Sequence, residues 1–293
     1  MNVYEETQLI LHKYKIQANK SLGQNFLVDD NVIDEIIRSS NIDKQDLIIE
    51  IGPGLGVLTN RLLKEANNVI AVELDKRMVN ILQDRFILNI NDQAESKLEI
   101  INEDILKINL NEIIAEKREQ TEIKSVKIVA NLPYYISTPI IMKLLENRLD
   151  IDEIIVMVQK EVAERLTAKT GTRLAGAITY AVEYYSDATS IIKVPKESFV
   201  PSPKVESEVI KLKVRKGKKI QVKDEKLLFN IISKSFMQRR KTLSNVLINN
   251  NIMHSKEDVK NMWKELEIDE NVRGESLTLE QFGEIADYIS EKK

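Results

Sequence analysis

The sequence predicts an α/β protein with a mostly parallel sheet, followed by a smaller all-helical domain. Two observations lead to this prediction. Short apolar runs alternate with longer segments whose apolar side chains recur at helical spacing, which is the pattern of βαβ units. After Gly217 no strand pattern remains, and only helical periodicity continues. We therefore expect one domain over residues 1–216, including an N-terminal arm, and a second over 217–293.

The strand candidates are short runs rich in β-branched and aliphatic residues. They cover residues 47–51, 69–74, 98–101, 126–130, 154–158, 190–194 and 207–214. The last run, SEVIKLKV, alternates polar and apolar residues, which is typical of an antiparallel strand near one edge of a sheet. Residues 109–125 form the most loop-like internal segment, charged and partly helical. The helices expected after the sheet cover residues 226–236, 241–249, 256–266 and 278–290.

Composition narrows the class of protein. The chain has 293 residues, of which 43% are hydrophobic and 30% charged, as in a globular protein. No apolar run approaches the roughly 20 residues that span a bilayer, and the acidic N-terminus is no secretory signal. We therefore expect a cytoplasmic protein with no membrane partner.

The side chains that most often bind metals are scarce. The chain has no cysteine, which excludes disulfides, thiolate zinc sites and a cysteine nucleophile. Its two histidines, His12 and His254, lie in polar, helix-like segments and are expected at the surface. We therefore expect no metal site and no Ser-His-Asp triad.

A glycine-rich loop follows the first strand of the sheet. Glu50 ends that strand, and Gly52, Gly54 and Gly56 open the next helix. Glycine lets the backbone approach a ligand closely. An acid at this point repels phosphates and favours a cationic ligand such as S-adenosylmethionine, which carries a sulfonium and an ammonium group. A tight turn that needs glycine for packing alone is the alternative.

Acidic residues also follow the next two strands. Glu73 is placed to accept the ribose hydroxyls of an adenosine, and Asp75 to cap the following helix. Asp104, with Glu103 beside it, is placed to accept the adenine amino group. Solvated loop acids are the alternative, but all lie at the carboxyl ends of successive strands, where open α/β sheets bind ligands.

The fourth strand ends in Asn131-Leu132-Pro133-Tyr134. A turn explains the asparagine and the proline. A catalytic role explains all four residues: the Asn131 side-chain oxygen and the Leu132 carbonyl accept the two N–H bonds of an adenine amine, Pro133 fixes the backbone, and Tyr134 stacks on the base. Methyl transfer to this amine then needs mainly positioning and electrostatics.

These motifs together resemble the small-subunit ribosomal RNA adenine N6,N6-dimethyltransferases. The matching stretches are NKSLGQNFL (19–27), EIGPGLG (50–56), ELD (73–75), NLPYYIS (131–137), VMVQKEVAERL (156–166), FVPSPKVESEVI (199–210), FMQRRKTLSNVL (236–247) and RGESLTLEQF (273–282). The resemblance implies a Rossmann-like class I S-adenosylmethionine-dependent methyltransferase fold with a seven-stranded sheet. One departure is Glu103, where the family commonly has glycine.

The resemblance also implies roles for individual residues. The catalytic site would comprise Asn131, Leu132, Pro133, Tyr134 and Phe199, with Phe199 as a second aromatic wall. The cofactor would contact Asn25, Leu27, Glu50, Gly52, Gly54, Gly56, Glu73, Leu74, Glu103, Asp104 and Asn131. The family dimethylates two adjacent adenosines in a hairpin near the 3′ end of the small-subunit RNA, within an assembling 30S particle. We expect a monomer.

The resemblance suggests a role for a basic stretch of the chain, residues 204–241. Residues 204–241 carry 13 Lys or Arg and only four Asp or Glu, although the net charge of the chain is −3. The block is either a solvated face or a phosphate-binding surface. The residues expected to bind RNA are Lys211, Lys213, Arg215, Lys216, Arg239, Arg240 and Lys241.

Two other functions fit parts of this pattern. A macrolide-resistance-type methyltransferase, which modifies one adenine of large-subunit RNA, shares the glycine loop and a similar catalytic tetrapeptide. A non-catalytic RNA-binding assembly factor on the same fold would lack the cofactor acids or the tetrapeptide, and this chain retains both.

Overall fold

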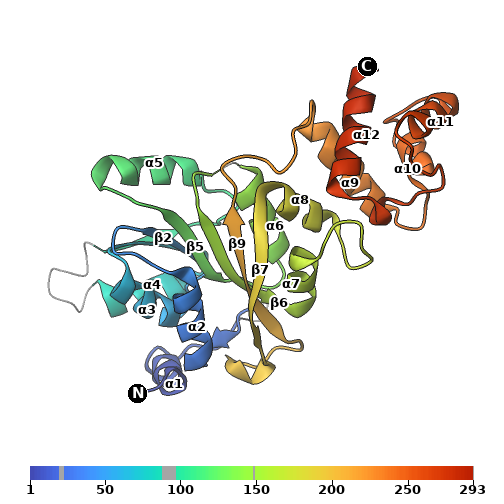
Figure 1. Ribbon diagram of the computed structural model, residues 1–293. Coiled ribbons are helices and arrows are strands. Elements are labelled where there is room, and N and C mark those ends of the chain that lie inside the picture. Colours follow the sequence, from blue (N-terminus) through green and yellow to red (C-terminus); the bar gives the residue numbers. More distant parts are fainter. Residues whose placement is uncertain (20–22, 88–96, 148, 293) are drawn as a thin grey trace. The chain divides into compact units, whose positions relative to one another are not determined.

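The computed structural model describes residues 1–19, 23–87, 97–147 and 149–292 (Figure 1). The chain divides into two compact units. The first consists of Met1–Ala163 and Thr189–Val214, and the second of Glu164–Ala188 and Arg215–Lys293. Residues 164–188 therefore group with the C-terminal helices rather than with the sheet around them in the sequence.

The first unit is built around a seven-stranded sheet with the order β4-β3-β2-β5-β6-β9-β7. Its strands are β2 (Leu47–Ile51), β3 (Asn68–Glu73), β4 (Leu98–Asn102), β5 (Val126–Asn131), β6 (Glu153–Gln159), β7 (Ser186–Val194) and β9 (Ser207–Val214). All seven predicted strands are present, although β7 begins earlier than predicted. The strand predicted to be antiparallel and near an edge, β9, pairs antiparallel with β6 and lies next to the edge strand β7.

The order of the strands places the functional loops. Strand β2 pairs in parallel with β3 on one side and with β5 on the other, and Glu50 lies opposite Val129. The chain thus winds outward in both directions from the β2–β5 pair, which is the topological switch point of the sheet. The loops that follow β2 and β5 must lie side by side there, and they carry the glycines and the tetrapeptide.

Helices with one buried face flank these strands. They are α1 (Val3–Lys13), α2 (Asp30–Ser40), α3 (Val57–Glu65), α4 (Lys76–Phe86), α5 (Leu110–Gln120), α6 (Ser137–Glu146) and α7 (Lys160–Thr167). Helix α2, for example, buries Val32, Ile33 and Ile36. The predicted cap of α4 is confirmed, because the Asp75 side chain accepts a hydrogen bond from the main-chain N–H of Arg77. The segment predicted as most loop-like is largely the helix α5.

A second, two-stranded sheet joins distant parts of the chain. Strand β1 (Phe26–Leu27) pairs antiparallel with β8 (Phe199–Val200), and Leu27 lies opposite Phe199. A 3-10 turn, η2 (Lys196–Ser198), precedes β8. This pairing holds the N-terminal arm beside the carboxyl edge of the main sheet, where β2 and β5 end.

The second unit packs helices around aromatic side chains. Its helices are α8 (Ala177–Tyr185), α9 (Glu225–Met237), α10 (Leu243–Asn249), α11 (Lys256–Glu265) and α12 (Leu279–Glu291), with the turn η3 (Gly274–Ser276). The Tyr180 ring lies 5.2 Å from Phe282 and 5.3 Å from Phe236. The four helices predicted after residue 217 are confirmed within two residues. Among the described residues, no helix is long and apolar enough to cross a membrane.

Candidate active site

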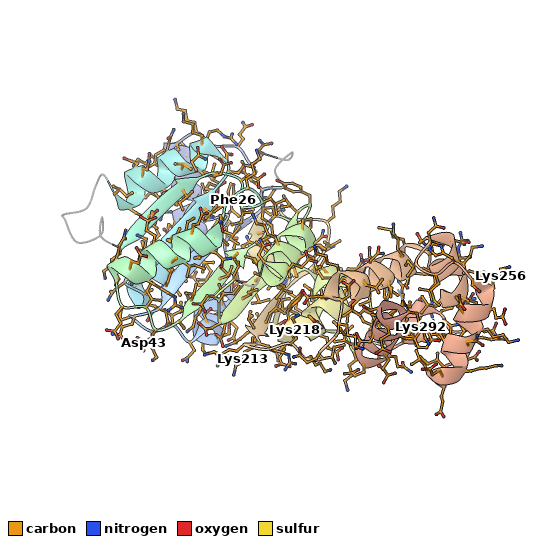
Figure 2. All side chains as sticks on the ribbon, turned by 90° about the horizontal axis from the view of Figure 1, so that it is seen from above. Phe26, Asp43, Lys213, Lys218, Lys256 and Lys292 are labelled. Carbon is orange, nitrogen blue, oxygen red and sulfur yellow. The ribbon has the colours of Figure 1, made fainter. Side chains whose placement is uncertain are left out.

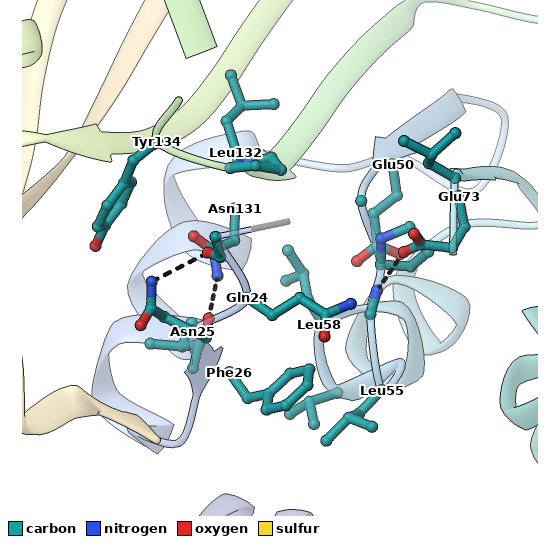
Figure 3. Close-up of a pocket in the computed structure, with 18 of the residues that line it drawn as sticks. Gln24, Asn25, Phe26, Glu50, Leu55, Leu58, Glu73, Asn131, Leu132 and Tyr134 are labelled. Carbon is teal, nitrogen blue, oxygen red and sulfur yellow. Dashed lines mark hydrogen bonds between the residues drawn. The ribbon is translucent and has the colours of Figure 1, made fainter. Parts of the chain in front are cut away.

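A pocket opens at the carboxyl ends of β2, β3 and β5, entirely within the first unit (Figure 3). Its lining comes from the arm, from Ile33 on α2, from the glycine loop and the start of α3, from the end of β3, and from residues 131–135. The lining residues are Gly23, Gln24, Asn25, Phe26, Leu27, Ile33, Glu50, Gly52, Pro53, Gly54, Leu55, Val57, Leu58, Glu73, Leu74, Asn131, Leu132, Pro133, Tyr134 and Tyr135.

The glycine loop brings the backbone close to the pocket. Gly52 and Gly54 have φ angles of +69° and +57°, which favour glycine. A Cβ on Gly54 would lie 3.6 Å from the ring of Phe26. The main-chain N–H of Gly54 donates to a carboxylate oxygen of Glu73 at 3.0 Å. The loop therefore holds that carboxylate in place without covering it with a side chain.

Two buried carboxyl groups face this pocket. Glu50 is 1% exposed and accepts a hydrogen bond of 2.6 Å from the Thr59 hydroxyl. Burial raises the pKa of Glu50 to about 8; the Thr59 bond lowers it and the nearby Glu73 raises it further. Burial also raises the pKa of Glu73, against the N–H groups of Asp75 and Gly54 that lower it. A positively charged ligand would stabilise the ionised form of both carboxyl groups.

The charge of the lining selects a ligand class. Among the described lining residues, Glu50 and Glu73 are the only charged side chains, and none is Lys, Arg or His. A pyrophosphate would find no counter-charge here, whereas a sulfonium or an ammonium group would find two acceptors. Two acids beside a close-approach glycine loop therefore fit a cationic ligand better than a phosphate.

The tetrapeptide leaves two oxygen atoms available. The Leu132 N–H donates to the carbonyl of Met157 on β6 at 3.2 Å, and the side-chain nitrogen of Asn131 donates to the carbonyl of Asn25 at 3.4 Å (Figure 3). Within the described part of the chain, no donor is found for the Asn131 side-chain oxygen or the Leu132 carbonyl. Two unused acceptors therefore stand at the mouth of the pocket.

Tyr134 is held in place from β9, which lies two strands away from β5 in the sheet. Its hydroxyl forms a 2.5 Å hydrogen bond with the Ser207 hydroxyl, and burial raises its pKa. The group therefore stays a neutral phenol at physiological pH. Because the ring is fixed at its far end, its face is free to stack against a planar ligand.

The arm is fastened at both sides of the pocket. The side-chain amide of Gln24 donates to Asp75 at 3.0 Å, at the start of α4. The carbonyl of Asn25 accepts the bond from Asn131 at the end of β5. Gly23 lies against the ring of Tyr135, since a Cβ added there would lie 3.3 Å from it. Residues 20–22 of the arm motif lie outside the described residues.

Four residues predicted for the site do not line this pocket. Gly56 points its open side toward α4, where Phe86 and Leu82 occupy the space. Asp104 accepts the main-chain N–H of Leu106 at 2.9 Å, and Glu103 is exposed. Phe199 is buried in the core, 3% exposed, beside β1. Their predicted contacts stay predictions.

Strand β4 nevertheless ends at the same edge of the sheet as the pocket. The side-chain amide of Asn102 donates to the carbonyls of Glu73 and Leu74, at 2.8 and 3.2 Å. This contact ties the end of β4 to the end of β3. Glu103 and Asp104, which follow directly, therefore begin next to the Leu74 rim of the pocket.

The profile of the family described as "Ribosomal RNA adenine dimethylase" matches residues 15–291. The chain belongs to this family. The predicted Rossmann-like class I methyltransferase fold is also confirmed. A solved structure, a dimethyladenosine transferase from Plasmodium falciparum, superposes on this chain with a TM-score of 0.71. That structure is 25% identical, and the match covers 89% of this chain and 95% of the other.

Bacterial relatives of this dimethylase are similar over their whole length. The protein named ribosomal RNA small subunit methyltransferase A from Lachnoclostridium phytofermentans is 46% identical, over 98% of this chain and 97% of the relative. The protein of the same name from Alkaliphilus oremlandii is 42% identical, over the same shares of each chain.

The basic residues of the dimethylase fall into two groups. Three of those predicted to bind RNA form internal ion pairs: Lys211 with Glu153, Arg215 with Asp187, and Arg239 with Glu275. The other four, Lys213, Lys216, Arg240 and Lys241, are exposed, and Figure 2 shows Lys213 at the surface. RNA contact stays a prediction for all seven.

Several lining residues were not singled out in the sequence. Among them are Gln24, Phe26, Leu55, Leu58 and Tyr135. Four of them, Gln24, Phe26, Leu55 and Tyr135, lie inside the quoted motifs and adjoin predicted site residues. The signal was therefore position within a motif rather than residue chemistry.

Proposed function

We propose that this protein dimethylates N6 of two adjacent adenosines in the 3′-terminal hairpin of small-subunit ribosomal RNA, using S-adenosylmethionine. The observation that carries the proposal is the pair of unused oxygen acceptors, on Asn131 and Leu132, beside a pocket whose charged side chains are both acids. Family membership and relatives named small subunit methyltransferase A support the choice of reaction and RNA over the large-subunit alternative.

The cofactor site would use the buried acids. Glu73 would accept the ribose hydroxyls, since a carboxylate has acceptor positions beyond the two N–H groups it already binds. Glu50 would offset the positive charge near the glycine loop, and Asp104 is proposed to accept the adenine amine. When bound, S-adenosylmethionine supplies an electrophilic methyl group.

The protein then positions the adenine amine. In the first transfer the Asn131 oxygen and the Leu132 carbonyl each accept one N–H of the amine, which directs the nitrogen lone pair out of the ring plane toward the methyl. In the second transfer the monomethylated amine keeps one N–H, which one of the two oxygens accepts. Tyr134 holds one face of the base, and Phe199 is proposed as the opposite wall. The target base must leave its stack to reach this site. The proton lost after each transfer passes to water, so no base with a shifted pKa is required.

The second unit, which includes Arg215 and Lys216, is proposed to bind the ribosomal particle. We further propose that the substrate is an assembling 30S particle, that the protein acts in the cytoplasm, and that it is a monomer, which sedimentation equilibrium would check. The exposed basic residues at the end of β9 and after α9 support a phosphate-rich partner.

Radiolabelled methyl transfer tests this function. The chain is incubated with labelled cofactor and under-methylated 30S particles, with 50S particles in parallel, and the labelled base is mapped. We expect label on two adjacent adenines of the small-subunit RNA. Label confined to large-subunit RNA, or no transfer to either particle, would refute the proposal.

A further inference from the structure

One aromatic side chain at the pocket has no part in the cofactor site or in the proposed chemistry. Tyr135 directly follows the tetrapeptide and lines the pocket. Its neighbour Tyr134 is half-buried, whereas Tyr135 is 56% exposed. Among the large apolar side chains exposed in the described part of the first unit, only Tyr135 and Leu74 line this pocket. An exposed aromatic ring at the opening of a site is typical of a residue that contacts a ligand.

The backbone on both sides of Tyr135 is fixed. The main-chain N–H of Ile136 donates to the carbonyl of Pro133 at 3.2 Å, which closes a turn. The hydroxyl of Ser137, which is 1% exposed, donates to the carbonyl of Tyr134 at 3.3 Å. Helix α6 begins at this serine. The turn therefore presents the ring of Tyr135 with little backbone entropy left to lose when a ligand binds.

The N-terminal arm supports this ring along one edge. A Cβ added to Gly23 would lie 3.3 Å from Cδ1 and 3.8 Å from Cε1 of Tyr135, which are neighbouring atoms on one side of the ring. Gly23 has a φ angle of +60°, so the arm comes this close through a residue without a side chain. The contact steadies the ring and leaves more than half of the side chain open to solvent.

The two consecutive tyrosines differ in their hydroxyl groups. The hydroxyl of Tyr134 is bonded to Ser207 at 2.5 Å. For the hydroxyl of Tyr135, no hydrogen bond to another described residue is found. The feature that Tyr135 offers to a ligand is therefore its flat ring, and a flat aromatic ring binds a nucleobase by stacking.

The proposed reaction creates a need for a second base site. When one of two adjacent adenosines leaves its stack to enter the pocket, the base next to it loses a stacking partner. Consecutive Cα atoms lie about 3.8 Å apart, so Tyr134 and Tyr135 start from adjacent points of the backbone. Tyr134 is held inside the pocket, and Tyr135 is exposed at its rim. Two rings on adjacent residues therefore match two bases on adjacent nucleotides.

We propose that Tyr135 is a stacking platform for the nucleobase next to the target adenosine. This inference rests on the proposed function for the identity of the RNA. Stacking on Tyr135 replaces the contact that the neighbouring base loses, which lowers the free-energy cost of flipping the target base. Every base has a flat face, so the platform favours an unstacked neighbour without reading its identity. Gly23 is a positioning residue that holds the ring.

The affinity of the full chain for under-methylated 30S particles tests the platform. We expect Tyr135→Ala to bind these particles about tenfold more weakly than the wild type, which lies within the range for one stacked base. Tyr135→Phe and Tyr135→Trp keep a flat ring and should bind within about twofold of the wild type. The matched control is Tyr4→Ala, a tyrosine 51% exposed on α1 that does not line the pocket, and it should also stay within twofold. Circular dichroism verifies that each variant is folded.

Abasic particles separate stacking on RNA from other roles of the ring. Two further particles are reconstituted with a ligated synthetic 3′ segment in which one or the other of the two adenosines is abasic. On at least one of them the wild type should lose affinity about tenfold, and Tyr135→Ala should lose no more, because the platform has no base to hold. An equal penalty for Tyr135→Ala on all three particles overturns the proposal, as does wild-type affinity of Tyr135→Ala for the intact particle. A loss that appears only in the affinity for S-adenosylmethionine, measured by calorimetry, also overturns it, because the ring then contacts the cofactor.

This proposal and the proposed function fail in different ways. A wild-type chain that binds the particles but transfers no methyl group refutes the proposed function, while the affinities still test the platform. Dimethylation by the wild type, together with equal penalties for Tyr135→Ala on intact and abasic particles, refutes the platform alone.

Discussion

Asn131 donates a hydrogen bond from its side-chain nitrogen to the main-chain carbonyl of Asn25, 3.4 Å away. This bond orients the side-chain amide of Asn131. Its nitrogen faces the Asn25 carbonyl, and its oxygen therefore points away from that carbonyl. The arm and the catalytic strand β5 thereby set the orientation of one side chain together. In the proposed reaction this side chain accepts an N–H of the target adenine.

Replacing Asn131 by alanine should lower methyl transfer by at least about 10²-fold, the loss typical for one preorganised group at a reacting centre. Cofactor affinity, measured by calorimetry, should stay nearly unchanged, because the proposed cofactor contacts come mainly from Glu50 and Glu73. Asn80→Ala, which removes an exposed amide on α4, serves as the control and should keep full transfer. Near-normal activity of Asn131→Ala would show that the amide is not a catalytic acceptor.

Replacing Glu73 by alanine should weaken cofactor binding by roughly 1–3 kcal/mol, the range for hydrogen bonds to a charged group. The variant also frees the N–H groups of Gly54 and Asp75, so Glu73→Gln, which keeps an acceptor, should lose less. Glu65→Ala, an exposed acid at the end of α3, is the control. Equal affinities for Glu73→Ala and Glu65→Ala would remove Glu73 from the cofactor site.

Cofactor affinity should depend on pH through Glu50. With the pKa of its carboxyl at about 8, the group is mostly protonated at neutral pH, whereas a cationic ligand favours the carboxylate. Binding then releases a proton, and the Kd should fall by up to about tenfold per pH unit until pH 8 and level off above it. Calorimetry in buffers of different ionisation enthalpy counts the proton, and Glu50→Gln should abolish its release. A wild-type protein that releases no proton would contradict this linkage.

The same group should make the ligand-free protein less stable in alkali. The folded-state pKa of about 8 lies above the ordinary 4.5, so the folded state binds the proton more tightly than the unfolded chain. The loss of folding stability from ionising Glu50 is absent below pH 4.5, grows as the pH rises, and is complete above about pH 8. Glu50→Gln should therefore raise the melting temperature more at pH 8.5 than at pH 5. An equal rise at both values would mean that Glu50 stays charged in the empty pocket.

Gly56 should tolerate no side chain. A Cβ there would lie 2.6 Å from Phe86 and 2.7 Å from Leu82, and its φ of +79° disfavours other residues. Gly56→Ala should lower the free energy of unfolding by about 2–4 kcal/mol, measured in urea. Gly217→Ala, where no atom lies within 4 Å of the added Cβ, should change it by less than about 0.5 kcal/mol. Similar stabilities of the two variants would contradict this packing argument.

Local periodicity was enough to predict the sheet, because each strand from β2 to β6 is a short apolar run with its own pattern. It was also enough to bring Glu50, Glu73 and Asn131 to one edge, since parallel strands end on the same side. Periodicity cannot show contacts between distant residues. The bond from Tyr180 to the carbonyl of Leu277, which joins residues 164–188 to the C-terminal helices, has no local signal.

Residue type was similarly ambiguous at single positions. The spacing of Gly52, Gly54 and Gly56 indicates three equivalent ligand-facing glycines, but the third leaves room for Phe86 and Leu82 instead. The arginine pair at 239–240 indicates phosphate contacts, but the guanidinium of Arg239 is satisfied by carbonyls and an acid inside the unit. In both cases the side chains that decide the role are far away in the sequence.

The acid-only lining of the pocket matters for competition among metabolites. ATP and the dinucleotides share an adenosine with S-adenosylmethionine but carry phosphate groups. Each brings negative charge to the place where Glu50 and Glu73 stand, with no Lys or Arg among the described lining residues to offset it. The acidic lining should therefore disfavour ATP and the dinucleotides relative to a cationic adenosine cofactor.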